Sequence, residues 1–431
     1  MRYLRKQLSK NKIARITYHI SRWLLIPKYR KDWDLIYVVD DSYHSFFSIK
    51  LVTILSPILY LVYKIIINRN LIFSVNNISH AIGHAYPEID ALIRMRKVGQ
   101  IDNKYKILYI YPKSPVLLAI KLIIEKCDVD DKICIIQSGL LNLMIAPLLL
   151  KYPELTVCAS ISAVNMKMDE NKKLANSLHF GDVIKYRMTD YAILRKQTRF
   201  FIPFNVNWNL PAILREFVGL SKYIVIQIKD TAVNGTLHPV DPVTYIKAIQ
   251  KAKELNYAVI FAGREKMPNS FINEGVINYS ESSHASPLND FLLVLNSVGV
   301  ISSASGFAFM ADIIEKPLLT LNSWHIVGYP GIKTISIPSR IELNGRLLTL
   351  VQQYEFSIQN GQNIHKMDNC VSIDASSQDI YDGFIDMIKF AKNKYYPETI
   401  IQKEFKNLFT SGPILEQDSI ISTKFLMKSI N

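Results

Sequence analysis

The chain has 431 residues, of which 49% are hydrophobic and 20% are charged. This composition excludes an intrinsically disordered protein, and the length favours two domains over a single core. The formal net charge of +14 predicts an anionic partner. Because the sequence contains no helix-turn-helix, zinc-finger or RNP motif, we expect that partner not to be a nucleic acid.

The first 31 residues contain many lysines and arginines and no acidic residue. Apolar residues such as Leu4, Trp23 and Leu24 alternate with these cations, which is typical of an amphipathic helix at an anionic membrane surface. A solvated basic arm that packs on its own domain is the alternative. We predict a basic and apolar N-terminal segment over residues 1–69, in a cytoplasmic protein that is peripheral on the inner face of the cytoplasmic membrane.

An apolar run over residues 51–67 lies inside this segment. Lys50 and Lys64 limit it to fewer than the ~20 apolar residues that a bilayer core requires, and Pro57 would interrupt it. The run therefore predicts a helix that is buried or lies along a membrane surface. The N-terminus also lacks the apolar region and cleavage site of a signal peptide.

Alternating strands and helices follow. The predicted elements are strands over 70–75, 106–111 and 132–139, and helices over 85–98, 115–126 and 140–152. Short apolar strands of this kind are typical of a parallel sheet that is buried on both faces. We predict a Rossmann-like acceptor domain over residues 70–205, in which the polar stretch from 166 to 220 carries the connection to the next domain.

The alternation then restarts. The predicted elements are strands over 222–230, 257–263, 276–280, 298–306 and 317–322, and helices over 242–256, 287–298 and 307–316. They predict a second doubly wound α/β domain over residues 206–376, followed by C-terminal helices over 377–431. The first of these helices, over 377–395, could return to pack on the first domain. Two such sheets facing a cleft form the GT-B architecture.

The segment Ile301–Asn322 carries the clearest functional pattern, because it predicts a strand, a tight turn of small residues and a helix. Backbone N–H groups at a helix start have no intrahelical partner, and the helix dipole adds partial positive charge. Ser303 and Ser305 add hydroxyls, and Gly306 allows the backbone to approach a ligand closely. Both features suit a phosphate or pyrophosphate. Serine and glycine also cap helices that bind no ligand, which is the alternative.

Two observations predict that the protein binds no metal. Asp128 and Asp130 form a DxD pattern, but it precedes a predicted strand and so lies at the amino-terminal edge of the sheet, where ligands do not bind. The four cysteines contain no CxxC pair and predict reduced thiols without a zinc site. We expect an enzyme that is metal-independent and needs no cofactor.

The chain resembles a family of glycosyltransferases encoded in bacterial surface-polysaccharide and lipopolysaccharide clusters. The similarity lies in IGHAYPEIDALIRMRKVG (82–99), with its GH and PE pairs, and in a series of motifs that ends with SSASGFAFMADIIEKPLLTLN (302–322). The resemblance implies a GT-B fold and transfer of a sugar from a nucleotide-sugar donor. This chain departs from the family at Lys229, where the family usually carries arginine, and a lysine neutralises phosphate without a bidentate fork.

The predicted donor-binding residues follow strands of the second domain and supply cations, hydroxyls or close backbone approach. They are Lys229, Gly263, Arg264, Ser280, Ser303, Ser305 and Gly306. For two of them a structural role is the alternative: Arg264 beside Glu265 could be a surface charge, and Lys229 could form a salt bridge to a nearby loop.

The predicted catalytic residues are His84 and Glu88. The imidazole of His84 has a pKa suited to accepting a hydroxyl proton near neutral pH, and Glu88 could orient it or act as the base itself. His80 in the same predicted loop competes for the role.

The sequence thus predicts a glycosyltransferase whose partners are a nucleotide-sugar donor, a lipid-linked or growing surface glycan, and an anionic membrane surface. A nucleotide-sugar epimerase with a GT-B-like fold is one alternative. A non-catalytic scaffold of a polysaccharide assembly complex is the other.

Overall fold

The computed structural model divides into two compact units, residues 1–176 and 177–431. It describes residues 56–75, 82–111, 114–127, 133–138, 141, 155, 189–198, 209–219, 222–229, 240–323, 326, 331–360, 367, 369–392, 398–409 and 413–429. The predicted α/β class is confirmed, since both units contain parallel sheets and helices that connect their strands. The basic residues 1–31 lie outside the described part of the chain.

The first unit contains a three-stranded parallel sheet in the order β1-β2-β3. Its elements are α6 (Ser56–Asn68), β1 (Leu71–Val75), α7 (Ile82–Lys97), β2 (Lys106–Tyr111), α8 (Pro115–Cys127) and β3 (Ile133–Gln137). Leu59 and Ile66 of α6 pack with Phe73 of β1 and Ile110 of β2. Burial of such aliphatic and aromatic side chains stabilises each by about 1.5–3 kcal/mol, so this cluster fixes α6 against the sheet.

Helix α7 begins at Ile82, three residues before the predicted start. Pro87 therefore lies inside the helix, where it removes the N–H that would bond to the carbonyl of Gly83. Farther along, Arg94 donates to the Asp90 carboxylate at 2.8 Å, and both side chains are fully buried. This i,i+4 ion pair is internal to α7, so the helix can be buried without leaving either charge uncompensated.

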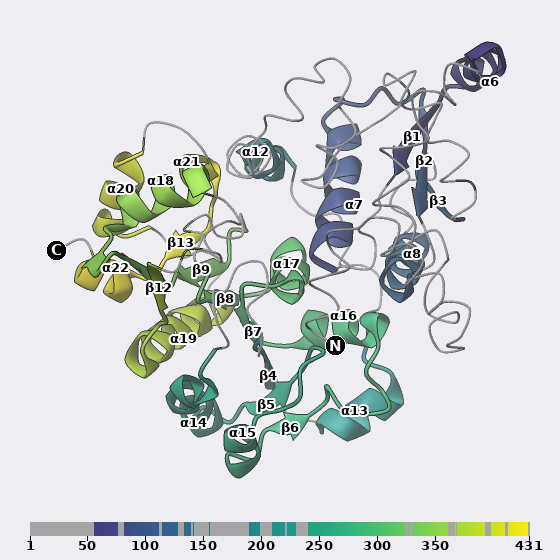
Figure 1. Cartoon of the computed structure of the whole chain (residues 1–431). Helices are drawn as coiled ribbons and strands as arrows, with labels where there is room; N and C mark the ends of the chain where they lie inside the picture. Colours follow the sequence, from purple (N-terminus) through teal and green to yellow (C-terminus); the bar gives the residue numbers. More distant parts are fainter. Residues whose placement is uncertain are drawn as a thin grey trace, which may run out of the picture. The chain divides into compact units, whose positions relative to one another are not determined.

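The second unit is built on a seven-stranded sheet in the order β13-β9-β8-β7-β4-β5-β6 (Figure 1). Every paired strand in it is parallel. The strands are β4 (Tyr223–Gln227), β5 (Ala258–Phe261), β6 (Ile277–Asn278), β7 (Gly299–Ser303), β8 (Leu318–Leu321), β9 (Thr334–Ile337) and β13 (Ile420–Ile421). All residues of β4, β7, β8 and β9 are buried, as the apolar sequence of these strands predicts.

Helices cover both faces of this sheet. The helices and the short 3-10 turn of the second unit are α12 (Thr189–Gln197), α13 (Ala212–Val218), η4 (Pro242–Tyr245), α14 (Ile246–Glu254), α15 (Asn269–Asn273), α16 (Pro287–Asn296), α17 (Gly306–Ile313), α18 (Leu350–Asn360), α19 (Ser377–Lys392), α20 (Ile400–Asn407), α21 (Pro413–Glu416) and α22 (Thr423–Ser429). Helices α14 and α19 contact each other on one face, and α16 and α17 contact each other on the opposite face. The chain moves along the sheet in one direction before β6 and in the other direction after it. Because the crossover connections are right-handed, the helices before β6 and those directly after it lie on opposite faces of the sheet.

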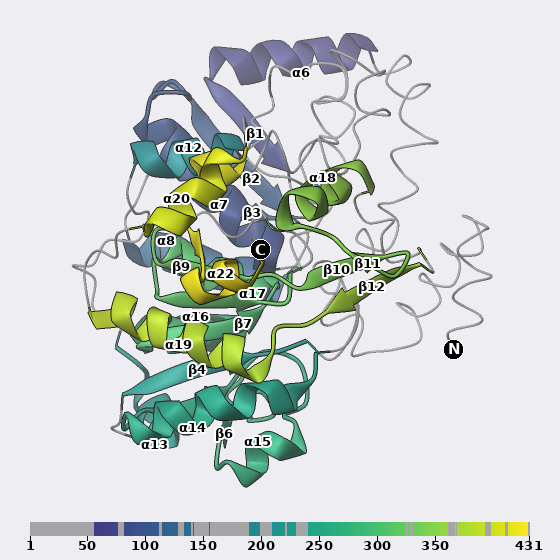
Figure 2. The same ribbon diagram turned by 90° about the vertical axis from the view of Figure 1, so that its left-hand side faces the viewer.

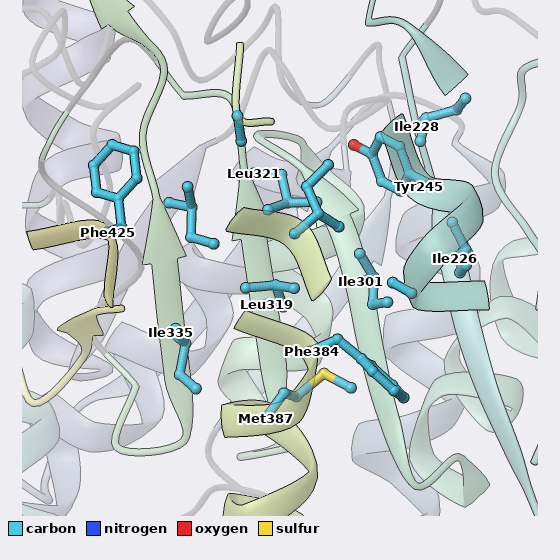
Figure 3. Packing of buried hydrophobic residues seen from close by; sticks show 14 of the residues in the cluster. Ile226, Ile228, Tyr245, Ile301, Leu319, Leu321, Ile335, Phe384, Met387 and Phe425 are labelled. Carbon is cyan, nitrogen blue, oxygen red and sulfur yellow. The ribbon is translucent and has the colours of Figure 1, made fainter. Parts of the chain in front are cut away.

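Helix α19 packs on the sheet of its own unit, against β7, β8 and β9. Figure 3 shows Phe384 and Met387 of α19 over Leu319 of β8. A Cβ on Gly383 would lie 2.8 Å from a Leu319 methyl group, so glycine allows the close approach. The helix that was expected to return to the first domain thus packs on the sheet of the second unit.

A second, antiparallel sheet lies in this unit and was not expected from the sequence (Figure 2). It consists of β10 (Arg340–Leu343), β11 (Arg346–Leu347) and β12 (Cys370–Ile373) in the order β11-β10-β12. The turn between β10 and β11 is Asn344–Gly345, and both residues have positive φ. This Asn-Gly pair is the usual signal for a two-residue hairpin.

Candidate functional site

The strand order of the seven-stranded sheet reverses at β4 and β7. After β4 the chain adds β5 and β6 on one side, and β7, β8 and β9 then extend the sheet on the other. In open parallel sheets, ligands bind outside the carboxyl ends of the strands at such a switch point. The candidate site is therefore the edge where β4 ends at Gln227 and β7 ends at Ser303.

Gln227 organises this edge. It is paired in register with Ser302, and its side chain is buried. Its Oε1 accepts hydrogen bonds from Ser302 Oγ at 2.8 Å and from Ser305 Oγ at 2.9 Å. The two hydroxyls also lie 3.1 Å from each other. These bonds hold the β7–α17 turn against the end of β4.

The turn leads directly into α17. Ser305 is the N-cap residue with extended backbone, and its Oγ accepts a hydrogen bond from Ala308 N. Gly306 is the first helical residue, as expected for a turn that exposes the helix start. The positive end of the α17 dipole therefore lies at the switch point, where it favours a bound anion.

Lys229 lies beside this turn. Its backbone N–H donates to Ser303 Oγ at 3.2 Å, which brings two of the predicted donor-binding residues into contact. Burial lowers the pKa of the Lys229 ammonium below its usual value, and the Glu265 carboxylate offsets only part of this shift. A half-buried cation at the carboxyl edge of the sheet suits an anionic ligand, because its charge is less screened than that of an exposed lysine.

Gly263 follows the end of β5 at the same edge of the sheet. Its φ is +113°, and a Cβ at this position would lie 2.9 Å from Gln227 Cγ. Only glycine tolerates both the left-handed backbone and this approach. The next residues place the Glu265 carboxylate within reach of Gln227 Nε2, which donates to it at 3.4 Å.

Arg264 directly follows Gly263 at the end of β5, and Ser280 follows β6, one strand farther along the sheet. Ser280 Oγ donates to Asn278 Oδ1 at 3.1 Å, and β6 is two strands from β4. Burial raises the pKa of Asp290, in the first turn of α16, to about 7, although a hydrogen bond with Tyr279 and the nearby Arg264 guanidinium both lower it. A carboxyl group that titrates near neutral pH thus lies close to the predicted donor contacts.

The two predicted catalytic residues are both in α7, at positions i and i+4 of one helical face. The carboxylate of Glu88 is buried and accepts hydrogen bonds from Tyr109 at 2.9 Å and Ser74 at 3.5 Å. The His84 side chain and the competing His80 lie outside the described residues. Their assignment as catalytic base stays a prediction.

Sequence reasoning missed Gln227, Glu265 and Asp290. A glutamine that ends the otherwise apolar strand YIVIQ was the one local signal for Gln227. Its partners Ser302 and Ser305 lie 75 and 78 residues away, so the network depends on the register of β4 against β7.

No protein-family model matches this sequence, and no curated protein sequence matches it. Several solved structures resemble it in fold. The iron-containing dodecameric glycosyltransferase TibC from enterotoxigenic E. coli is 12% identical with a TM-score of 0.40, and the match covers 62% of each chain. The chain thus spans about three fifths of TibC.

For two further structures the match covers more of the known protein's length. The ADP-heptose LPS heptosyltransferase II of E. coli is 11% identical with a TM-score of 0.43, over 75% of this chain and 99% of that one. The UDP-GlcNAc 2-epimerase of Methanocaldococcus jannaschii is 11% identical with a TM-score of 0.31, over 75% and 99%. Likeness at this level concerns the fold alone.

The TibC structure corrects one expectation. We predicted a metal-independent enzyme without a cofactor, but a glycosyltransferase of similar fold is described as iron-containing. Metal independence therefore does not follow from the fold, and we withdraw it. Within the described residues, no three His, Cys, Asp or Glu side chains are grouped to hold a metal ion; Asp128 and Asp130 lie outside them.

None of the helices in the described part of the chain is both long and apolar enough to cross a bilayer.

Proposed function

We propose that this protein is a glycosyltransferase that binds a nucleotide-sugar at the switch point of the seven-stranded sheet. It transfers the sugar to a lipid-linked or growing bacterial surface glycan at the cytoplasmic face of the membrane. The proposal rests on one observation: the α17 N-terminus, the half-buried Lys229 and the close glycine turn at Gly263 occupy the same edge of one sheet.

Each part has a chemical role in this reaction. A nucleoside diphosphate leaves with additional negative charge on its terminal phosphate, and fixed dipoles and cations stabilise that charge. Backbone N–H groups at the start of α17 and the Lys229 ammonium would supply both at one place. On the acceptor side, His84 is proposed to remove the hydroxyl proton of the glycan.

A thermal-shift titration tests the donor site. The wild-type chain and two variants, Lys229→Gln and Lys222→Gln, are heated with ADP-, UDP-, GDP-, CMP- and dTDP-linked sugars. Lys222 is the matched control, because it is an exposed lysine at the opposite end of the same strand. We expect one nucleotide class to stabilise the wild type by about 2–3 kcal/mol at 100 times Kd. The shift should be lost in Lys229→Gln and kept in Lys222→Gln.

Two outcomes contradict the donor site. No response to any nucleotide-sugar would favour a non-catalytic scaffold, and an equal response in both variants would place the ligand elsewhere.

A second assay separates the transferase from an epimerase. The stabilising nucleotide-sugar is incubated with the protein, with and without glycolipid extract, and the products are separated by chromatography. A transferase releases the nucleotide only when acceptor is present, whereas an epimerase changes the sugar without any acceptor. We expect His84→Gln to keep the thermal shift and lose the acceptor-dependent release.

A further inference from the structure

Helix α6 of the first unit carries large apolar side chains on a face that no other described element covers. Ile58, Leu61 and Ile65 are 61%, 64% and 49% exposed. Their i, i+3, i+7 spacing aligns them in one stripe along the helix. Tyr60 and Val62, 52% and 37% exposed, flank that stripe. We call these five residues the outer face of α6.

The opposite face of the same helix is already used. Leu59 and Ile66 are buried against β1 and β2, and Tyr63 packs beside them. Both Figure 1 and Figure 2 show α6 beside β1. A helix that is apolar all round is normally buried on all sides or lies in a membrane. With 13 residues, α6 is shorter than the ~20 residues that a membrane span requires.

Among the described residues, the charged side chains of α6 and of the turn directly after it, Lys64 and Arg69, are positive. Lys64 lies on the exposed side of the helix, with its ammonium 5.5 Å from the centre of the Tyr60 ring. Arg69 follows the helix and is exposed. The sequence contains no acidic residue between Asp41 and Glu88. Apolar side chains, an aromatic ring and cations without acids together form the pattern of a helix that lies in an anionic lipid interface.

A symmetric contact between two copies of this chain fits the same face poorly. A two-fold pairing of α6 would place Lys64, which lies near the middle of the helix, close to Lys64 of the second copy. It would bring no acidic residue from this helix to neutralise them. An anionic membrane surface supplies that charge instead.

We propose that the outer face of α6 docks on an anionic lipid bilayer, with the helix axis in the plane of the interface and the lysine and arginine near the lipid phosphates. The outer face of α6 would thus be the surface through which the protein reaches the membrane location of its proposed function. Docking does not depend on nucleotide binding, so the two proposals can fail separately.

Vesicle co-sedimentation of the full chain tests the proposal without nucleotide present. The vesicles contain either phosphatidylglycerol and phosphatidylcholine in a 1:3 ratio or phosphatidylcholine alone. The test variant is Leu61→Asp/Ile65→Asp. The matched control is Ile272→Asp/Ile400→Asp, which alters residues of the second unit that are 54% and 77% exposed.

We expect the wild type and the control to bind the anionic vesicles, and the α6 variant to bind at least about tenfold more weakly. Equal binding of all three proteins would overturn the proposal. Absence of wild-type binding to anionic vesicles would also overturn it. Light scattering is measured in parallel: a wild-type dimer that becomes a monomer in the α6 variant, with unchanged vesicle binding, would mean that the face pairs two copies.

A second variant keeps the test valid if the aspartates disturb folding. Leu61→Trp keeps an apolar side chain at the centre of the outer face, and Ile400→Trp is its control. Vesicles with brominated acyl chains should quench the added fluorescence of Leu61→Trp and not that of Ile400→Trp. Equal quenching in both would refute docking through α6.

Discussion

The buried ion pair between Arg195 and Asp312 should contribute strongly to the stability of the second unit. Arg195 of α12 donates to the Asp312 carboxylate and, at 2.8 Å, to its backbone carbonyl. The other carboxylate oxygen of Asp312 accepts from Gly331 N and Thr334 Oγ1, both at 2.8 Å. Arg195 is 8% exposed and Asp312 is 1% exposed, so solvent compensates neither charge.

Removing Arg195 would leave the carboxylate buried without its cation. Such a change costs about 3–5 kcal/mol, because the desolvation of the remaining charge is no longer offset. The next residue provides the control: Lys196 pairs with Glu416 at 3.3 Å, but both side chains are nearly two-fifths exposed. A surface pair of this kind contributes about 0–1 kcal/mol.

The assay compares urea unfolding of the wild type, Arg195→Met and Lys196→Met, followed by far-UV circular dichroism. We expect Arg195→Met to lower the free energy of unfolding by at least about 3 kcal/mol and Lys196→Met by less than about 1 kcal/mol. Adding Asp312→Asn to Arg195→Met should restore part of the loss, because the orphaned charge is gone. If the two single variants differ by less than about 0.5 kcal/mol, the ion pair does not hold α12 to this unit.

Three further changes test the sites described above. Gly263→Ala should lower the free energy of unfolding by about 1–3 kcal/mol, because its Cβ would meet Gln227 in a left-handed conformation, and an unchanged melting temperature would contradict this. Burial raises the pKa of Asp290 to about 7, so the stability linked to its protonated form is complete below pH ~4 and is lost as the pH rises through about 7. Between pH ~4 and ~7, the free energy of unfolding of Asp290→Asn should rise relative to that of the wild type by at most about 4 kcal/mol, as measured from denaturation curves at each pH. A difference between the two proteins that does not change with pH would exclude the pKa shift. Tyr109→Phe removes a donor to the buried Glu88 carboxylate and should cost about 1–3 kcal/mol, which an unaltered urea midpoint would disprove.

The sequence was sufficient to predict the alternating architecture because each strand is short, apolar and bounded by polar turns. The strands expected over 106–111 and 317–322 were observed as Lys106–Tyr111 and Leu318–Leu321. Strand ends were less accurate: the strand expected over 222–230 ends at Gln227. The end of β4 is set by its hydrogen-bonded pairing with β5 and β7. These partner strands lie elsewhere in the sequence, so the local pattern carries no information about them.

Contacts between distant segments could not be predicted from local patterns. The expected helix over 377–395 has an apolar face, but nothing in that face specifies which sheet it covers. The choice follows from the shape at Gly383, which fits between Ile337 and Leu319. Arg195 is similar, since it lies before the predicted domain boundary at residue 205 and yet pairs with Asp312, 117 residues away.

The hydrogen bonds at the switch point also indicate how the serines and the backbone would share the binding of an anion. Ser302 Oγ and Ser305 Oγ both donate to Gln227 Oε1, and a hydroxyl has a single proton to donate. While they hold Gln227, these hydroxyls cannot also donate to a phosphate oxygen. The groups that would face the anion are the first backbone N–H groups of α17 and the Lys229 ammonium. Ser302 and Ser305 then shape the turn and fix the helix start, so nucleotide affinity should depend more on the cation than on these two hydroxyls.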